Sequence, residues 1–119
     1  MGWDIMILNT HDTQPIAQVD TSALPSFGLR QVFIDRLNEL FPQIDWDQDF
    51  AYGHLDNEDY FGNIGLGKNE EMTGYFWLGI YGGANPLNFI MTLCNEYNCL
   101  AFDTVTSEYI TLIPRLNKC

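Results

Sequence analysis

Basic residues are scarce in this chain. Only 5 Lys and Arg stand against 16 Asp and Glu in 119 residues, and the formal net charge is -11. Nucleic acids and anionic membrane surfaces carry charge of the same sign and would repel such a protein. The composition therefore disfavours both as direct partners, and it favours either a basic protein partner or solubility alone.

Cysteine and long apolar runs are scarce as well. The three cysteines are Cys94, Cys99 and Cys119, and an odd number without paired spacing predicts reduced thiols. No apolar run approaches the roughly 20 residues of a membrane-spanning helix. The first residues also lack the basic stretch and the long apolar segment of a secretion signal. We therefore expect a cytoplasmic protein.

Hydrophobic residues are abundant, at 46% of the chain, and aromatic residues make up 14%. This content argues against disorder despite the charge. A chain of 13.7 kDa has the size of one domain, so residues 1–119 are expected to form a single α+β domain.

Two helices are predicted. An apolar stripe at helical spacing ends before Pro42 and follows Ser26, which is a plausible N-cap. Asn85 and Pro86 suit the start of a second helix, and Asn98 can adopt the left-handed conformation that ends it.

Six strands are predicted from alternating or strongly β-forming segments, at residues 3–8, 50–55, 60–66, 72–81, 99–103 and 108–113. Both faces of the 72–81 segment are apolar, which predicts a central strand. The element order is β-α-β-β-β-α-β-β. Two helices cannot cover both faces of a wide sheet, so we expect a two-layer α+β sandwich, mostly antiparallel, with both helices on one face.

Three chemical motifs are weak. Asp45, Asp47 and Asp49, with Asp56 at the twelfth position, imitate a calcium loop, but Phe50 occupies the position that needs glycine. Residues 62–68 match half of a phosphate-binding loop without the helix start that such a loop needs. A Cys–His pair leaves no local signature and stays open. We assign no catalytic residue, metal or cofactor.

Acidic residues concentrate between Asp45 and Glu71, where Lys68 is the only basic residue. Such a stretch would attract a basic protein if its loops gather in space, although a solvated charged face is the common alternative. Trp46 lies between two aspartates, which suits either an exposed anchor or a cap on the first helix. The candidate binding residues are Asp45, Trp46, Asp47, Asp49, Tyr52, Asp56, Glu58, Asp59, Tyr60, Glu70 and Glu71.

Several stretches together resemble a family of small acidic bacterial proteins. They are residues 3–9 (WDIMILN), 27–30 (FGLR), 41–46 (FPQIDW), 83–94 (GANPLNFIMTLC) and 101–110 (AFDTVTSEYI). The chain looks like the immunity proteins that accompany polymorphic and contact-dependent growth-inhibition toxins. This resemblance implies a non-enzymatic cytosolic inhibitor that binds one cognate toxin domain. Such toxins are often basic nucleases (RNases or DNases), which would fit the charge.

Two alternatives remain. The carboxylates of residues 45–59 could hold a divalent cation in an enzyme or a ligand-binding protein, or the chain could be an acidic adaptor domain for another basic partner.

Overall fold

The computed structural model describes residues 3–49, 51–56, 60–82 and 86–110. In this part of the chain, two helices accompany one sheet of seven strands in the order β2-β3-β4-β5-β1-β6-β7. The helices are α1 (Arg30–Leu40) and α2 (Pro86–Tyr97). The strands are β1 (Trp3–Leu8), β2 (Asp45–Trp46), β3 (Tyr52–Asp56), β4 (Phe61–Gly65), β5 (Tyr75–Gly82), β6 (Leu100–Asp103) and β7 (Glu108–Tyr109). Two single-turn 3-10 helices, η1 (Ile16–Gln18) and η2 (Thr21–Ala23), follow β1.

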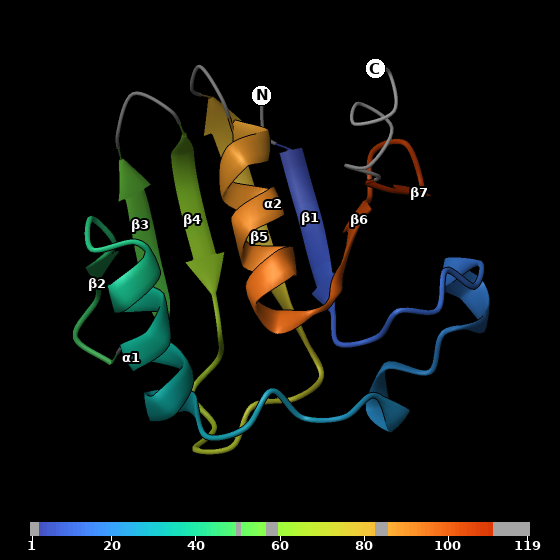
Figure 1. Cartoon of the computed structure of the whole chain (residues 1–119), viewed down its shortest axis with the longest axis horizontal. Helices are drawn as coiled ribbons and strands as arrows, with labels where there is room; N and C mark the ends of the chain where they lie inside the picture. The colour runs from blue at the N-terminus through green and yellow to red at the C-terminus, as the bar shows by residue number, and fades with distance from the viewer. Residues whose placement is uncertain (1–2, 50, 57–59, 83–85, 111–119) are drawn as a thin grey trace.

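Every strand pair in the sheet is antiparallel. Both helices lie on the same face of the sheet, in front of the strands in Figure 1. The predicted two-layer α+β sandwich is therefore confirmed. The predicted element order lacked only β2, whose two residues are too few for an alternation pattern to show. Among the described residues, no helix is long and apolar enough to cross a membrane.

The start of α1 differs from the prediction. Leu29 occupies the N-cap position without a side-chain hydrogen bond, so the expected cap by Ser26 is wrong. Instead, the Ser26 hydroxyl accepts the N–H of Gly28 at 2.8 Å and donates to the Met72 carbonyl at 2.6 Å. Gly28 has φ 100°, where glycine is favoured. Ser26 thus fixes the turn before the helix.

The ends of both helices match the sequence pattern. The last residue of α1 is Leu40, two residues before Pro42. Asn98 has φ 56° directly after α2, which is the left-handed conformation that commonly ends a helix. The predicted cap at Asn85 and the end of the last predicted strand, residues 111–113, lie outside the described residues.

The core lies between the sheet and the helices. Its fully buried large side chains come from alternate positions on the strands and from one stripe on each helix; they include Ile5, Ile7, Leu55, Ile64, Leu78, Ile34, Leu37, Phe89, Ile90 and Leu93. Each contributes about 1.5–3 kcal/mol by leaving water. The central strand β5 has Phe76, Leu78 and Ile80 in this layer, whereas Trp77 and Tyr81 on its other side are exposed. The central place predicted for residues 72–81 is confirmed, but only one of its faces is fully buried.

Candidate functional site

The described acidic residues of the 45–71 stretch do not gather on one surface. Asp45, Tyr52 and Asp56 lie on the face of the sheet opposite the helices. Tyr52 and Asp56 alternate with the buried residues of β3. Asp45 on β2 pairs with His54, which lies on the same face of β3. The other described candidates lie elsewhere or have structural roles. Glu58 and Asp59 lie outside the described residues.

Trp46 belongs to the helix side of the sheet. It is partly buried, packs against the core and donates its indole N–H to the Asn38 side-chain oxygen on α1 at 2.8 Å. Of the two alternatives from the sequence, this position matches the cap on the first helix and argues against an exposed anchor.

Asp47 and Asp49 stabilise the connection between β2 and β3. The Asp47 carboxylate accepts the backbone N–H of Ala51 at 3.0 Å and that of Tyr52 at 3.4 Å. The Asp49 carboxylate forms an ion pair with Lys68 at 3.3 Å. Both carboxylates are thus already engaged within the molecule, and the hairpin that they support is not a calcium loop.

Tyr60 is a core residue and not a surface anchor. It is 8% exposed, and its ring lies 4.8 Å from that of Phe89 and 6.4 Å from that of Phe41, measured between centroids. Its ring therefore contributes to the core. Glu70 and Glu71 are exposed beside the start of α1, where the Glu70 carbonyl accepts the N–H of Arg30 at 2.8 Å.

A different set of residues comes together on the sheet. We define the open face as the surface of β2, β3, β4 and β5 opposite the helices, formed by Asp45, Tyr52, His54, Asp56, Phe61, Asn63, Gly65, Trp77, Gly79 and Tyr81. Four large aromatic side chains are exposed there: Tyr52 (57%), Phe61 (48%), Trp77 (44%) and Tyr81 (48%). On the same side of β1 and β6, Leu8 and Phe102 are buried, and Met6 and Leu100 are partly buried. Among the described residues, the exposed large aromatic side chains therefore all lie on β3, β4 and β5.

Two glycines leave room for tyrosine rings to lie along this surface. A Cβ on Gly65 would meet the Tyr52 ring at 3.2 Å, and one on Gly79 would meet the Tyr81 hydroxyl at 3.1 Å. Both tyrosines therefore lie along the sheet above glycines, an arrangement known to protect strand glycines. Residues 75, 77, 79 and 81 alternate as Tyr, Trp, Gly and Tyr. The sequence predicts apolar residues on both faces of this strand, but it does not show that the face of Trp77 and Tyr81 is left exposed.

One hollow on the open face combines acidic and aromatic groups. It has a volume of about 470 Å³ and is lined by Asp45, His54, Leu55, Asp56, Phe61, Gly62, Asn63 and Tyr81. Asp45 lies directly across from His54 in the β2–β3 register, and Asp56 follows two positions along β3. Asn63 donates from its side-chain amide to the Tyr81 hydroxyl at 3.4 Å. The hollow can accept a positively charged or hydrogen-bond-donating group between its carboxylates and its rings.

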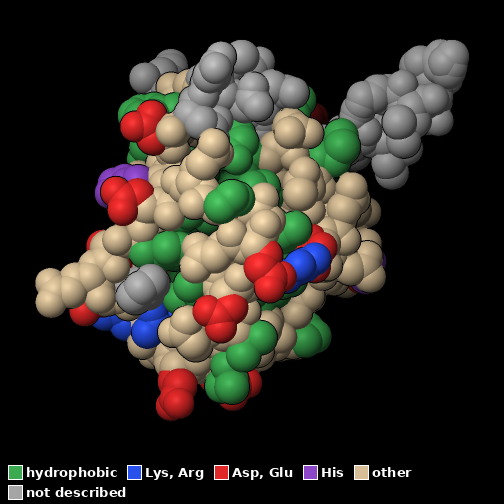
Figure 2. Space-filling model, turned by 60° about the vertical axis from the view of Figure 1, so that its left-hand side comes forward, with side chains coloured by type: hydrophobic (Ala, Val, Ile, Leu, Met, Phe, Trp, Pro, Cys, Tyr) green, Lys and Arg blue, Asp and Glu red, His purple; other side chains and the backbone are tan. Residues whose placement is uncertain are grey.

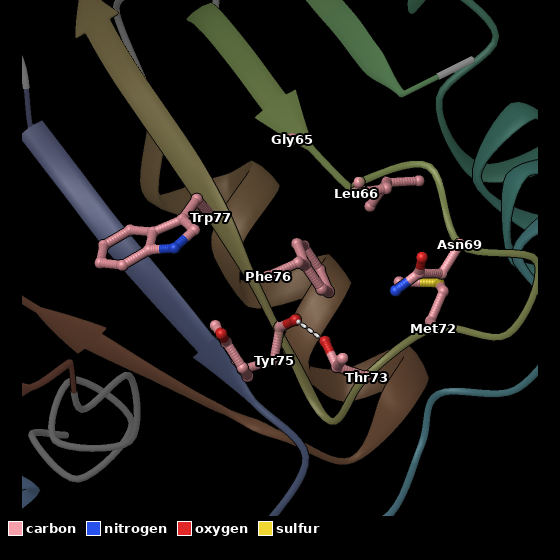
Figure 3. Close-up of a pocket in the computed structure, with 9 residues that line it drawn as sticks. Gly65, Leu66, Asn69, Met72, Thr73, Tyr75, Phe76 and Trp77 are labelled. Atoms are coloured by element: carbon pink, nitrogen blue, oxygen red, sulfur yellow. Dashed lines mark hydrogen bonds between the residues drawn. The ribbon is translucent and has the colours of Figure 1, made fainter. Parts of the chain in front are cut away.

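A second, smaller hollow lies at the other end of β4 and β5 (Figure 3). Its volume is about 230 Å³, and it is lined by Gly65, Leu66, Gly67, Asn69, Met72, Thr73, Tyr75, Phe76 and Trp77. The Thr73 hydroxyl in it donates to the Tyr75 carbonyl at 2.9 Å. No carboxylate, imidazole or thiol is among these lining groups, so the hollow offers shape and apolar contact but no acid, base or nucleophile of those kinds.

The basic side chains of the described residues are all engaged internally. Arg36 contacts Glu39 and Glu96 at 2.7 Å each, and its hydrogen bond holds the pKa of Glu96 below the usual range. Arg30 donates to the carbonyls of Asn69 and Asp49, and Lys68 pairs as described above. In Figure 2, acidic side chains are spread over the visible side, whereas basic ones are few and lie near acidic ones. The described surface is therefore strongly negative.

The described thiols lie in the core, whereas both histidines are exposed. Cys94 and Cys99 are buried and not in a disulfide. The hydrogen bond with Cys94, together with burial, raises the pKa of Cys99. Cys94 belongs to α2, whereas His54 lies on the opposite face of the sheet. His11 is exposed in the segment after β1, and Cys119 lies outside the described residues.

No group of three or more His, Cys, Asp or Glu side chains within the described ranges could hold a metal ion. Residues 62–68, which resemble half of a phosphate-binding loop, form the end of β4 and the turn after it, and no helix starts there. Neither motif supplies a site in this part of the chain.

Asp103 is the one buried charged residue among those described. Burial opposes its charge, but hydrogen bonds from the Trp3 side chain and from the N–H groups of Val105 and Thr106 outweigh it and hold the pKa of Asp103 below the usual range. The two backbone bonds measure 2.9 and 3.4 Å. Asp103 therefore stabilises the β6–β7 turn, which is a structural role.

Comparisons with protein-family models, with curated proteins and with solved structures found no match to this chain.

Proposed function

We propose that this protein is an inhibitor of the immunity type, which binds and neutralises a cognate basic toxin domain, such as an RNase or a DNase. The observation that carries the proposal is the negative surface. The net charge is -11, and each of the three described basic side chains is already engaged with a carboxylate or a carbonyl.

A nuclease needs a basic groove to hold its phosphate backbone. An acidic protein can compete for that groove, because its carboxylates offer the same kind of charge-assisted hydrogen bond to Lys and Arg that phosphates offer. Long-range attraction also accelerates the encounter of oppositely charged proteins. The resemblance of the sequence to immunity proteins supports the same function.

The experiment has two steps. The partner is first identified by pull-down from the source cell and purified, and its activity is then titrated with this protein. We expect loss of the partner's toxic activity near one equivalent. We also expect an association rate that falls at least tenfold between about 20 and 500 mM NaCl, because salt screens the attraction.

Two results would refute the proposal. One is a partner that binds but keeps its full activity, and the other is an association rate that salt leaves unchanged. A partner with a net negative charge would also contradict the electrostatic argument.

A further inference from the structure

We propose that the open face is the surface on which the basic partner docks, and that the hollow between Asp45, Asp56, Phe61 and Tyr81 receives one Arg or Lys side chain of that partner. The inference rests on the proposed function and gives it a location. The sequence suggested the loops of the acidic stretch as the binding surface, and we now propose a face of the sheet in their place.

The first argument is the apolar surface of the face. Scattered exposed aromatics are ordinary, but a contiguous group of them marks an interaction surface. Here four of them share one face: Gly65 pairs with Tyr52 on one side and with Trp77 on the other, and the rings of Phe61 and Tyr81 lie 6.3 Å apart. Large aromatic side chains are the groups that most often anchor protein interfaces.

The second argument is charge complementarity. Asp45 and Asp56 are exposed in the hollow, and neither side chain has a hydrogen bond or an ion pair to another described residue. No described Lys or Arg belongs to the open face, whereas the carboxylates of Asp47, Asp49, Glu39 and Glu96 are already paired elsewhere. The hollow thus holds two available carboxylates beside two rings.

This combination fits a cationic side chain. A guanidinium or ammonium group between the carboxylates would form charge-assisted hydrogen bonds, and the faces of Phe61 and Tyr81 would add cation–π attraction. A second copy of this chain fits poorly, because a symmetric contact would set the same carboxylates of two open faces near each other. The occupant is therefore a basic protein and not the chain itself.

The probe for the hollow is the peptide acetyl-Gly-Arg-Gly-amide, and its control is the same peptide with citrulline, which keeps the shape of arginine but lacks its charge. The ¹⁵N-labelled full chain is titrated with each peptide at low salt and pH 7.5. We expect saturable amide shifts on β2, β3, β4 and the 79–82 end of β5 with the arginine peptide, and none with the citrulline peptide.

Matched variants locate the binding. Asp45→Asn and Asp56→Asn should each weaken the apparent affinity for the arginine peptide about two- to fivefold, the range of one exposed ion pair. Asp35→Asn changes the net charge equally but lies on α1, so it should leave the affinity unchanged. Tyr81→Ala should weaken binding of both the peptide and the purified partner, because it removes one wall of the hollow.

Several outcomes would overturn the inference: shifts concentrated on the helices, equal shifts with both peptides, or equal losses for Asp35→Asn and Asp56→Asn. Open-face shifts that depend on protein concentration without peptide would assign the face to a second copy instead. The proposed function fails separately. If the open face binds arginine but the chain inhibits no toxin, the function is wrong. If inhibition survives the open-face variants, only the location is wrong.

Discussion

Gly62 makes the sharpest structural prediction, because the backbone of β5 lies against it. A Cβ added at Gly62 would sit 1.9 Å from the Gly79 carbonyl oxygen, 2.9 Å from the Gly79 carbonyl carbon and 3.0 Å from the Ile80 Cα. The β4–β5 register shifts between Phe61 and Gly62, which brings the two backbones together at this point. The atoms in the way belong to the backbone and not to a movable side chain.

The cost of Gly62→Ala follows from that geometry. The Gly79 carbonyl would have to retreat by about 1 Å, since real Cβ contacts essentially never fall below 3.0 Å. A shift of that size breaks two or three hydrogen bonds of the β4–β5 ladder, at about 1 kcal/mol each. It also disturbs the packing of Ile64 and Leu78. We therefore expect a loss of about 3 kcal/mol in the free energy of unfolding.

Urea denaturation followed by circular dichroism measures this loss, and the midpoint should fall by about 1–3 M. Gly82→Ala is the matched control, because a Cβ there meets no atom within 4 Å, and it should change stability by less than about 0.5 kcal/mol. Gly65→Ala meets only the movable Tyr52 ring and should fall between the two. If Gly62→Ala were as stable as Gly82→Ala, the close approach of β4 and β5 would be wrong. A variant that is unfolded without urea would agree with the expectation.

Three further predictions concern single side chains. Asp103→Asn should cost about 1–2 kcal/mol at pH 7, because the carboxylate accepts two backbone N–H groups. Its pKa is depressed in the folded state, so this contribution is present above the unfolded pKa of about 3.9 and disappears as the pH falls through the folded pKa. Urea titrations at several pH values should show that the free energies of unfolding of Asp103→Asn and wild type converge below about pH 4. A difference that does not depend on pH would contradict the charge-based cause. The Tyr97 hydroxyl is buried without a hydrogen-bond partner among the described residues, and burial raises the pKa of Tyr97 to about 12. Tyr97→Phe should therefore leave stability unchanged or raise it by up to about 1 kcal/mol, and a loss above that would reveal a missing partner for the hydroxyl. Trp46→Phe should cost about 1 kcal/mol through the lost bond to Asn38 and should leave the partner's affinity unchanged, whereas a large loss of affinity in a binding titration would return Trp46 to the interface.

The candidate site shows where sequence reasoning reaches its limit. The net charge follows from composition, so the sequence identified an acidic protein without any knowledge of the fold. Position along the chain did not reveal the neighbours in space, because Asp47 and Asp49 follow Asp45 closely in sequence but bind the turn backbone and Lys68. The exposure of Trp77 and Tyr81 could not be predicted, since an apolar run does not reveal which face of a strand another layer covers.

The sequence by itself determined the helices, most strands and the two-layer class. These features depend on hydrophobic periodicity and on proline and glycine, whose effects on the backbone extend over only a few residues. The alternation along residues 52–56, 61–65 and 75–81 also determined which side chains share a face. Only the tertiary structure decided which face the helices cover. The reason is physical: the exposure of Tyr52, Phe61, Trp77 and Tyr81 depends on what packs across the sheet from distant parts of the chain, and the pairing of β2 with β3 places Asp45 beside His54.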